Sequence, residues 1–196
     1  SLAFHPQKNI LAVGGEDGSL QFRSVPELKL VSTLPAHKNA VTAGEFNARG
    51  DVFVSGSQNG KLIVWDWKNK KQLSVIEFED AVTDLKIHPK REEIAVGTAG
   101  GNFEIWSLEK GEQLYNINKF EAGLTQVAFD NNGQRIICAL ENGSVHIWEY
   151  GASLHLQTLS GHERTVESLE FSADSKRLIS SAADKSVRIW KLESKE

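Results

Sequence analysis

The sequence lacks several features that would place it in a specialised class of protein. It has no methionine and a single cysteine, Cys138, so it cannot form an internal disulfide. A reducing compartment follows, and we expect an intracellular protein, cytoplasmic or nuclear. No apolar run approaches the roughly 20 residues of a membrane span, and the start shows no signal-peptide pattern. Because translated chains ordinarily start with methionine, we interpret Ser1 as a trimmed or internal start.

The chain also lacks a strong charge of either sign. Its formal net charge is −4 at pH 7, with a pI near 5.9. This mild balance argues against a dedicated surface for nucleic acid or anionic membranes, although a nucleic-acid partner stays open. Hydrophobic residues make up 40% and charged residues 24% of the 196 residues, close to globular averages. The length is therefore sufficient for a substantial core.

What the sequence does contain is a repeat. Four similar segments end in Trp65, Trp106, Trp148 and Trp190, which are 41, 42 and 42 residues apart. A weaker copy, SLQFRSV (19–25), has Arg23 at the corresponding position, again 42 residues before Trp65. This spacing lies within the roughly 40–45 residues of a four-stranded propeller blade.

Within each repeat the pattern is that of β-strands. Apolar residues alternate with outward residues at period two, as in Leu62 and Val64 or Phe103 and Ile105. Tight-turn dipeptides precede these stretches: Asp17-Gly18, Asn59-Gly60, Gly100-Gly101, Asn142-Gly143 and Asp184-Lys185. No stretch has the i, i+3, i+4, i+7 apolar spacing of a helix, so we expect helices to be almost absent. Nineteen strands fit the chain.

The segment 161–192, from Gly161-His162 to Trp190, resembles a near-consensus WD40 repeat, and the resemblance covers essentially the whole chain. It implies an all-β fold of WD40-type β-propeller blades, each a four-stranded antiparallel sheet. About four and two-thirds repeats are present, and the last blade lacks its outer strand. The expected blades of this single propeller segment are approximately 1–35, 36–78, 79–119, 120–160 and 161–196.

The resemblance also bears on completeness. WD40 rings most often have seven blades, which at this period need about 290 residues. We therefore expect part of a longer propeller, or a propeller completed by a partner chain or by a missing segment. A closed five-bladed ring is the alternative. An open array would expose an edge strand and the apolar faces of its end blades.

In WD40 repeats a His, a Ser or Thr, an Asp and the Trp form a buried hydrogen-bonded tetrad. By position, the last blade has the complete set and the second blade has Asn59 in place of Asp: His162, Ser180, Asp184 and Trp190, then His37, Ser55, Asn59 and Trp65. The polar positions are lost in the third blade (Phe78, Val96, Gly100) and partly in the fourth (Phe120, Cys138, Asn142). We expect apolar packing to replace the network there.

A His–Ser–Asp set also invites a serine-hydrolase interpretation. The structural interpretation is stronger, because the residues recur at repeat positions. No His, Cys, Asp or Glu cluster has metal-ligand spacing. We therefore predict no enzyme, no catalytic residue, no cofactor and no metal site.

Family propellers usually bind partners through the loops that enter the first strand of each blade and those that join the second strand to the third. The corresponding residues here are Lys38, Asn39, Gln58, Asp80, Ala99, Glu121, Glu141, Glu163, Arg164 and Ala183. Such a mixed-charge rim suits a protein partner better than a nucleic acid. A separate basic turn, Lys68 with Lys70 and Lys71, could touch phosphates but is more typical of a solubilising edge.

These observations predict a non-catalytic protein–protein interaction scaffold within a multiprotein complex. Two alternatives stay open. One is a subunit of an RNA-associated or RNA-processing assembly, whose affinity for RNA would fall steeply with salt. The other is a regulatory or sensor domain of a larger multidomain protein.

Overall fold

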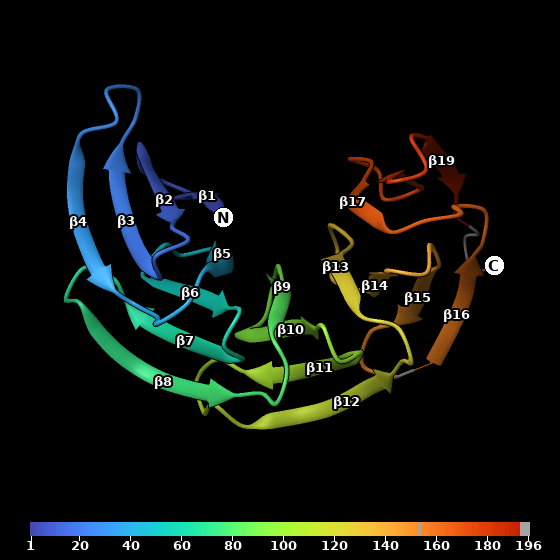
Figure 1. Cartoon of the computed structure of the whole chain (residues 1–196), viewed down its shortest axis with the longest axis horizontal. Helices are drawn as coiled ribbons and strands as arrows, with labels where there is room; N and C mark the ends of the chain where they lie inside the picture. The colour runs from blue at the N-terminus through green and yellow to red at the C-terminus, as the bar shows by residue number, and fades with distance from the viewer. Residues whose placement is uncertain (153, 193–196) are drawn as a thin grey trace.

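The computed structural model describes residues 1–152 and 154–192, and Figure 1 shows them as an open arc of β-sheets. Nineteen strands form five antiparallel sheets, and no helix occurs in these residues. The predicted all-β fold of propeller blades is therefore confirmed. Within each sheet the strands follow chain order, so that consecutive strands of the sheet pair with one another.

The first two sheets come from the amino-terminal part of the chain. Their strands are β1 (Leu2–Phe4), β2 (Ile10–Gly14), β3 (Ser19–Ser24) and β4 (Leu30–Pro35), then β5 (Val41–Phe46), β6 (Val52–Ser57), β7 (Lys61–Asp66) and β8 (Lys71–Glu77).

The third and fourth sheets are built in the same way. Their strands are β9 (Val82–Ile87), β10 (Glu93–Thr98), β11 (Asn102–Ser107) and β12 (Gln113–Lys119), then β13 (Leu124–Phe129), β14 (Arg135–Leu140), β15 (Val145–Glu149) and β16 (Leu154–Leu159). The fifth sheet has three strands within the described residues: β17 (Val166–Phe171), β18 (Arg177–Ala182) and β19 (Val187–Lys191).

The sheets stand side by side around a common centre. In Figure 1 the first strand of each sheet lies nearest the centre of the arc, and in the four-stranded sheets the fourth strand lies on the outside. Neighbouring inner strands touch, as β5 and β9 do, and then β9 and β13. The first and fifth sheets flank the opening of the arc.

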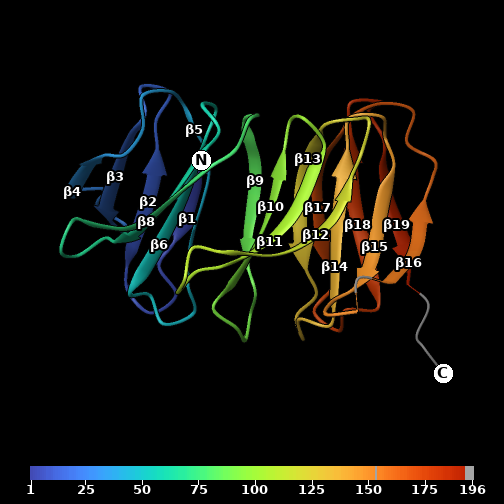
Figure 2. The ribbon, with the colours of Figure 1, turned by 90° about the horizontal axis from the view of Figure 1, so that it is seen from below.

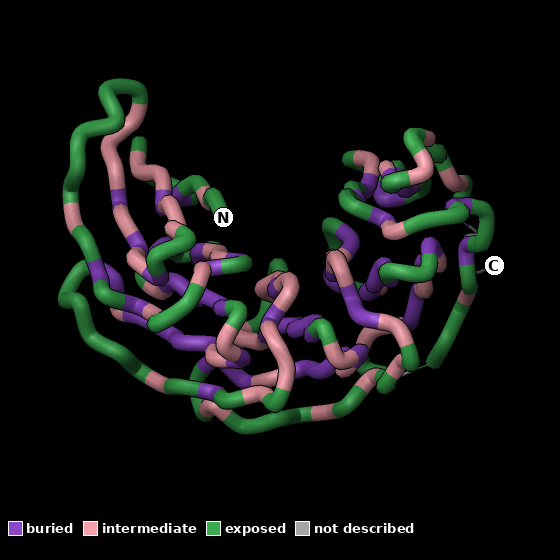
Figure 3. The backbone as a smooth tube through the Cα atoms, in the orientation of Figure 1, coloured by how far each residue is buried: buried purple, intermediate pink, exposed green. Residues whose placement is uncertain are grey.

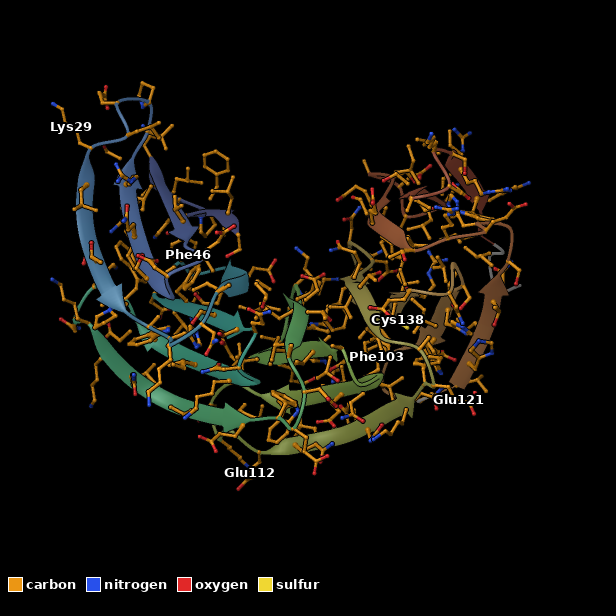
Figure 4. The ribbon with its side chains drawn as sticks, in the orientation of Figure 1. Lys29, Phe46, Phe103, Glu112, Glu121 and Cys138 are labelled. Carbon is orange, nitrogen blue, oxygen red and sulfur yellow. The ribbon has the colours of Figure 1, made fainter. Side chains whose placement is uncertain are left out.

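The core lies between the sheets, because each blade has apolar side chains on both faces and can bury them only against its neighbours. Four clusters of buried residues each join two consecutive sheets. Phe46, labelled in Figure 4, is an example from the boundary between the first and second sheets. Its ring centroid lies 6.0 Å from that of Phe22 in the first sheet and 4.7 Å from that of Phe53 in the second. Figure 3 shows this buried band along the middle of the arc.

The two sheets beside the opening have no neighbouring sheet on their outward faces within the described residues. Large apolar side chains are consequently exposed on both. Leu2 and Phe4 of β1 are 70% and 69% exposed, and Val187 and Ile189 of β19 are 65% and 70% exposed. The apolar end faces that the repeat count predicts are thus present in the structure.

The turn between the second and third strands of a blade explains one regular feature of the repeat. Gly18, Gly60, Gly101 and Gly143 occupy this turn in the first four blades, with φ between 76° and 88°. At each, a Cβ atom would clash with a carbonyl oxygen of the loop that enters the next blade. In the fifth blade Lys185 occupies the position with φ 65°. The glycines therefore serve both the turn and the contact between blades.

Candidate partner-binding rim

The fifth blade contains a polar network that runs from a tryptophan to an aspartate. The Trp190 indole N–H donates to Ser180 Oγ over 2.8 Å, and Ser180 Oγ lies 2.7 Å from His162 Nε2. His162 Nδ1 in turn lies 3.0 Å from Asp184 Oδ2. With Nδ1 carrying the imidazole proton, every donor in this chain has an acceptor: indole to hydroxyl, hydroxyl to Nε2, and Nδ1–H to carboxylate.

Asp184 anchors this network to the turn between β18 and β19. Its carboxylate accepts bonds from the backbone N–H of Glu163 (3.1 Å) and from the backbone N–H and hydroxyl of Ser186 (2.9 and 2.6 Å). The Ser186 hydroxyl is the largest cause that holds the pKa of Asp184 well below its usual range. One side chain thereby fixes the turn, the incoming loop and the imidazole relative to one another.

The second blade has only part of this network. His37 Nε2 lies 2.8 Å from Ser55 Oγ, and the Trp65 indole N–H donates to the same oxygen over 3.0 Å. Asn59, predicted to replace the aspartate, does not join: its side-chain oxygen accepts the Lys61 backbone N–H within its own turn. His37 Nδ1 therefore has no hydrogen-bond partner within the described residues. Burial, aided by the Lys61 charge, lowers the pKa of His37 to about 4.

In the third and fourth blades a phenylalanine takes the place of the histidine. Phe78 meets Trp106 edge to face at 5.6 Å, and Phe120 meets Trp148 at 5.7 Å. His162 and Trp190 are arranged similarly at 6.1 Å. An aromatic ring of similar size therefore keeps the packing against the tryptophan without the hydrogen bonds.

Sequence reasoning missed one member of these networks. The Trp106 indole N–H donates to Glu104 Oε2 over 2.9 Å, because Val96 offers no hydroxyl at the usual position. Glu104 is 9% exposed although it carries a carboxylate. One feature of the sequence could have identified Glu104: it is a charged residue in the middle of an otherwise apolar strand, two residues before the repeat tryptophan. The first blade has a bond with the same two-residue spacing. Arg23, at the tryptophan position, donates from its guanidinium to the side-chain oxygen of Gln21.

The tetrad serines are poorly placed for catalysis. Ser55 is fully buried and Ser180 is 1% exposed. Each hydroxyl is already engaged by an indole and an imidazole. Cys138 is also fully buried, and burial raises the pKa of its thiol, which suppresses the reactive thiolate. Within residues 1–152 and 154–192 no group of three or more His, Cys, Asp or Glu side chains is arranged to hold a metal ion.

The residues predicted to bind partners lie in connections at one end of the strands. Figure 2 shows the strands and these connections from the side. We call this set the rim: Lys38, Asn39, Gln58, Asp80, Ala99, Glu121, Glu141, Glu163, Arg164 and Ala183. It combines the loops that enter each blade with the turns between its second and third strands. Because every strand reverses direction, these two kinds of connection share one end of each sheet.

Backbone hydrogen bonds hold the rim together. In four successive blades the turn donates an N–H to a carbonyl of the incoming loop: Gln58 to Ala40 (3.0 Å), Ala99 to Ala81 (2.9 Å), Glu141 to Gly123 (3.0 Å) and Ala183 to Thr165 (2.9 Å). The Thr165 hydroxyl also donates to the Glu141 carbonyl, which links the fourth and fifth blades. The rim is therefore a set of braced turns rather than of independent loops.

The rim side chains themselves face solvent. All are exposed except Asp80, which is half-buried because its carboxylate lies directly over Gly100. Carboxylates outnumber cations, with Asp80, Glu121, Glu141 and Glu163 against Lys38 and Arg164. The part of the rim on the third to fifth blades is consequently acidic.

Comparison with known proteins agrees with this geometry. The profile of the family described as "WD domain, G-beta repeat" (WD40) matches residues 1–23, 28–66, 111–149 and 154–191, which is more than half of the chain. The chain belongs to the WD40-repeat family. The profile does not match 67–110, which includes most of the third blade, where Phe78, Val96 and Gly100 stand at the tetrad positions.

Individual relatives match only part of the chain. It is 30% identical over 114 residues to the periodic tryptophan protein 2 homolog of Neurospora crassa, covering 57% of this chain and 13% of that protein. It is 26% identical over 120 residues to pre-mRNA-processing factor 19 of Bos taurus, covering 60% and 24%. The chain thus spans a quarter or less of these relatives' length.

Among solved structures, the chain is similar to the β-propeller domain of Cps50 (Swd1) from Myceliophteria thermophila. The TM-score is 0.88 at 16% identity, covering 97% of this chain and 64% of that one. This similarity supports the propeller fold. WD40 repeats generally mediate protein–protein interaction, and the matched profile indicates no enzymatic family. The described residues include no helix with the length and apolarity that crossing a membrane requires.

The burial of the repeat tryptophans predicts different costs for their removal. Trp65 is 3% exposed, with a blade on either side, whereas Trp190 in the end blade is only partly buried. Trp65→Ala should lower the free energy of unfolding by about 3–5 kcal/mol, and Trp190→Ala by less. Denaturant titration of both variants measures the difference. If both variants lost the same free energy of unfolding, packing between blades would not determine the destabilisation.

The buried His37 predicts a dependence of stability on pH. Its folded-state pKa of about 4 lies below the usual 6.5, so protons bind preferentially to the unfolded chain. Its contribution to stability is complete above pH 6.5 and is lost as the pH falls toward about 4. Urea titrations across this range should show a shallower decline for His37→Gln than for the parent. The matched control is His155→Gln, since His155 is exposed. If the stability of His37→Gln declined with falling pH as steeply as that of the parent, His37 would not be the source of the pH dependence.

Proposed function

We propose that this chain is a non-catalytic scaffold that joins other proteins into a multiprotein complex, working as one propeller segment in the cytoplasm or nucleus. The observation that carries the proposal is the rim, whose exposed side chains stand on turns braced by backbone hydrogen bonds. A preorganised surface loses little conformational entropy when a partner binds.

The charge of the rim supports a protein partner over a nucleic acid. Its third-to-fifth-blade portion presents Asp80, Glu121, Glu141 and Glu163 with Arg164 as the one rim cation. These carboxylates repel phosphates and attract lysine and arginine side chains. We infer that the partner presents a basic and polar surface to this part of the rim.

A second candidate is membership in an RNA-processing assembly. It is supported by the name of one relative, pre-mRNA-processing factor 19. In such an assembly this chain would still act by binding proteins. Direct RNA binding would instead show a steep loss of affinity with salt, which a titration with a labelled RNA oligonucleotide reveals.

Charge reversal at the rim tests the proposal. The double variant Glu121→Lys, Glu163→Lys should lose proteins that the parent chain captures from native lysate, identified by mass spectrometry, because two carboxylates that attract the partner become repulsive. The matched control is Glu109→Lys, Glu112→Lys, since both glutamates are exposed in the turn between β11 and β12 at the opposite end of the strands. Glu121 and Glu112 are labelled in Figure 4.

Proteins retained by the control and lost by the rim variant would support a rim-binding scaffold. If the rim variant captured the same proteins as the parent, the rim would not be the binding surface. Circular dichroism of both variants checks that the fold is intact.

A further inference from the structure

Two lysines from different blades converge on one buried tryptophan. Lys8, in the turn between β1 and β2, has its Nζ 5.8 Å from the centroid of the Trp67 ring. Lys68, directly after Trp67 in the turn between β7 and β8, has its Nζ 5.9 Å from the same centroid. Both lysines are exposed, and Trp67 beneath them is 4% exposed. The sequence predicted only that Lys68 belongs to an exposed, solubilising turn. The structure shows that the ammonium group of Lys8, 60 residues earlier in the chain, lies over the same tryptophan ring.

The backbone beneath this pair is fixed from both blades. His5 Nδ1 accepts the backbone N–H of Gln7 (3.0 Å) and of Lys8 (3.1 Å), so His5 Nε2 carries the ring proton and donates to the Gly50 carbonyl (3.0 Å). The Trp67 indole N–H donates to the same carbonyl over 3.1 Å. One carbonyl therefore holds both the turn of Lys8 and the ring on which the ammonium groups lie.

The two ammonium groups form no ion pair within the described residues. Neither Lys8 nor Lys68 lies within ion-pair distance of a carboxylate there. The nearest acid in sequence, Asp66, accepts hydrogen bonds from the side-chain amide and backbone N–H of Asn69, which chiefly lower its pKa, and the Lys68 charge adds to that lowering without forming an ion pair. The Lys68 charge lowers the pKa of Lys8, as expected for two cations in proximity. His5 is held as a neutral imidazole, because its Nδ1 accepts two backbone N–H groups, and it therefore adds no charge to the site.

We propose that Lys8 and Lys68 form a binding site for a phosphate monoester on a protein partner, a phosphoserine or phosphothreonine side chain. A phosphate monoester carries nearly two negative charges at pH 7, which matches two adjacent ammonium groups better than one carboxylate does. Nucleic acid fits less well, because Trp67 is too buried to stack on a base. The site lies at the end of the strands opposite the rim, so it is independent of the rim proposal.

The test is a titration of the parent chain with a short peptide containing phosphoserine, followed through the Trp67 indole N–H signal in nitrogen-15 NMR spectra. The signal should shift saturably with the phosphopeptide and not with its unphosphorylated form. Lys8→Ala, Lys68→Ala should bind at least about tenfold more weakly. The matched control Lys70→Ala, Lys71→Ala, with the same change of charge in the same exposed region, should bind like the parent.

Several outcomes would overturn the proposal. These are no saturable shift, equal weakening in the control pair, or equal shifts with sulfate or with the unphosphorylated peptide. Tighter binding to vesicles containing a phosphoinositide, or to an RNA oligonucleotide, would also overturn it and would assign the pair to a lipid or to RNA. The rim variant Glu121→Lys, Glu163→Lys should keep the phosphopeptide affinity, so failure of one proposal leaves the other testable.

Discussion

Packing between neighbouring blades is the constraint on which the rest of the structure depends. A four-stranded sheet with apolar side chains on both faces cannot bury them alone. All four buried clusters are accordingly shared by two consecutive blades. Phe4 and Ile189 are exposed on the two end faces, which shows that a blade face without a neighbouring blade leaves its apolar side chains in solvent.

Polar contacts follow the same boundaries. His5 donates to the Gly50 carbonyl of the next blade, and His88 lies 3.0 Å from the Gly133 carbonyl in the equivalent place two blades later. Glu45 accepts a backbone N–H from β9 (2.6 Å), and Asp84 accepts one from β13 (2.9 Å). Burial raises the pKa of both carboxyl groups. These bonds fix the rotation of one blade against the next, and so fix the spacing of the rim turns.

The sequence was enough to predict the fold because its signals are local and periodic. The tryptophans at 65, 106, 148 and 190 and the turn glycines repeat with the blade. The tetrad positions could be assigned from one complete copy, and the structure shows the corresponding bonds around His162. Asn59 departed from expectation because its single side-chain oxygen accepts the Lys61 N–H within its own turn, whereas Asp184 accepts the equivalent Ser186 N–H with one oxygen and has a second oxygen for His162. The Lys8 and Lys68 pair could not be predicted, since no pattern within one repeat tells which turns of adjacent blades converge.

Native-state hydrogen exchange of the chain tests the central claim most directly. β10, β14 and β18 are each the second strand of a sheet and pair with a strand on both sides, so their hydrogen bonds within the sheet are alike. Only β10 and β14 belong to blades with a neighbour on each face. If packing between blades supplies the stability, amides of β10 and β14 should exchange most slowly, and those of β18 markedly faster. Equal protection of β18 and β14 would contradict this account and would place the stability within the individual sheets.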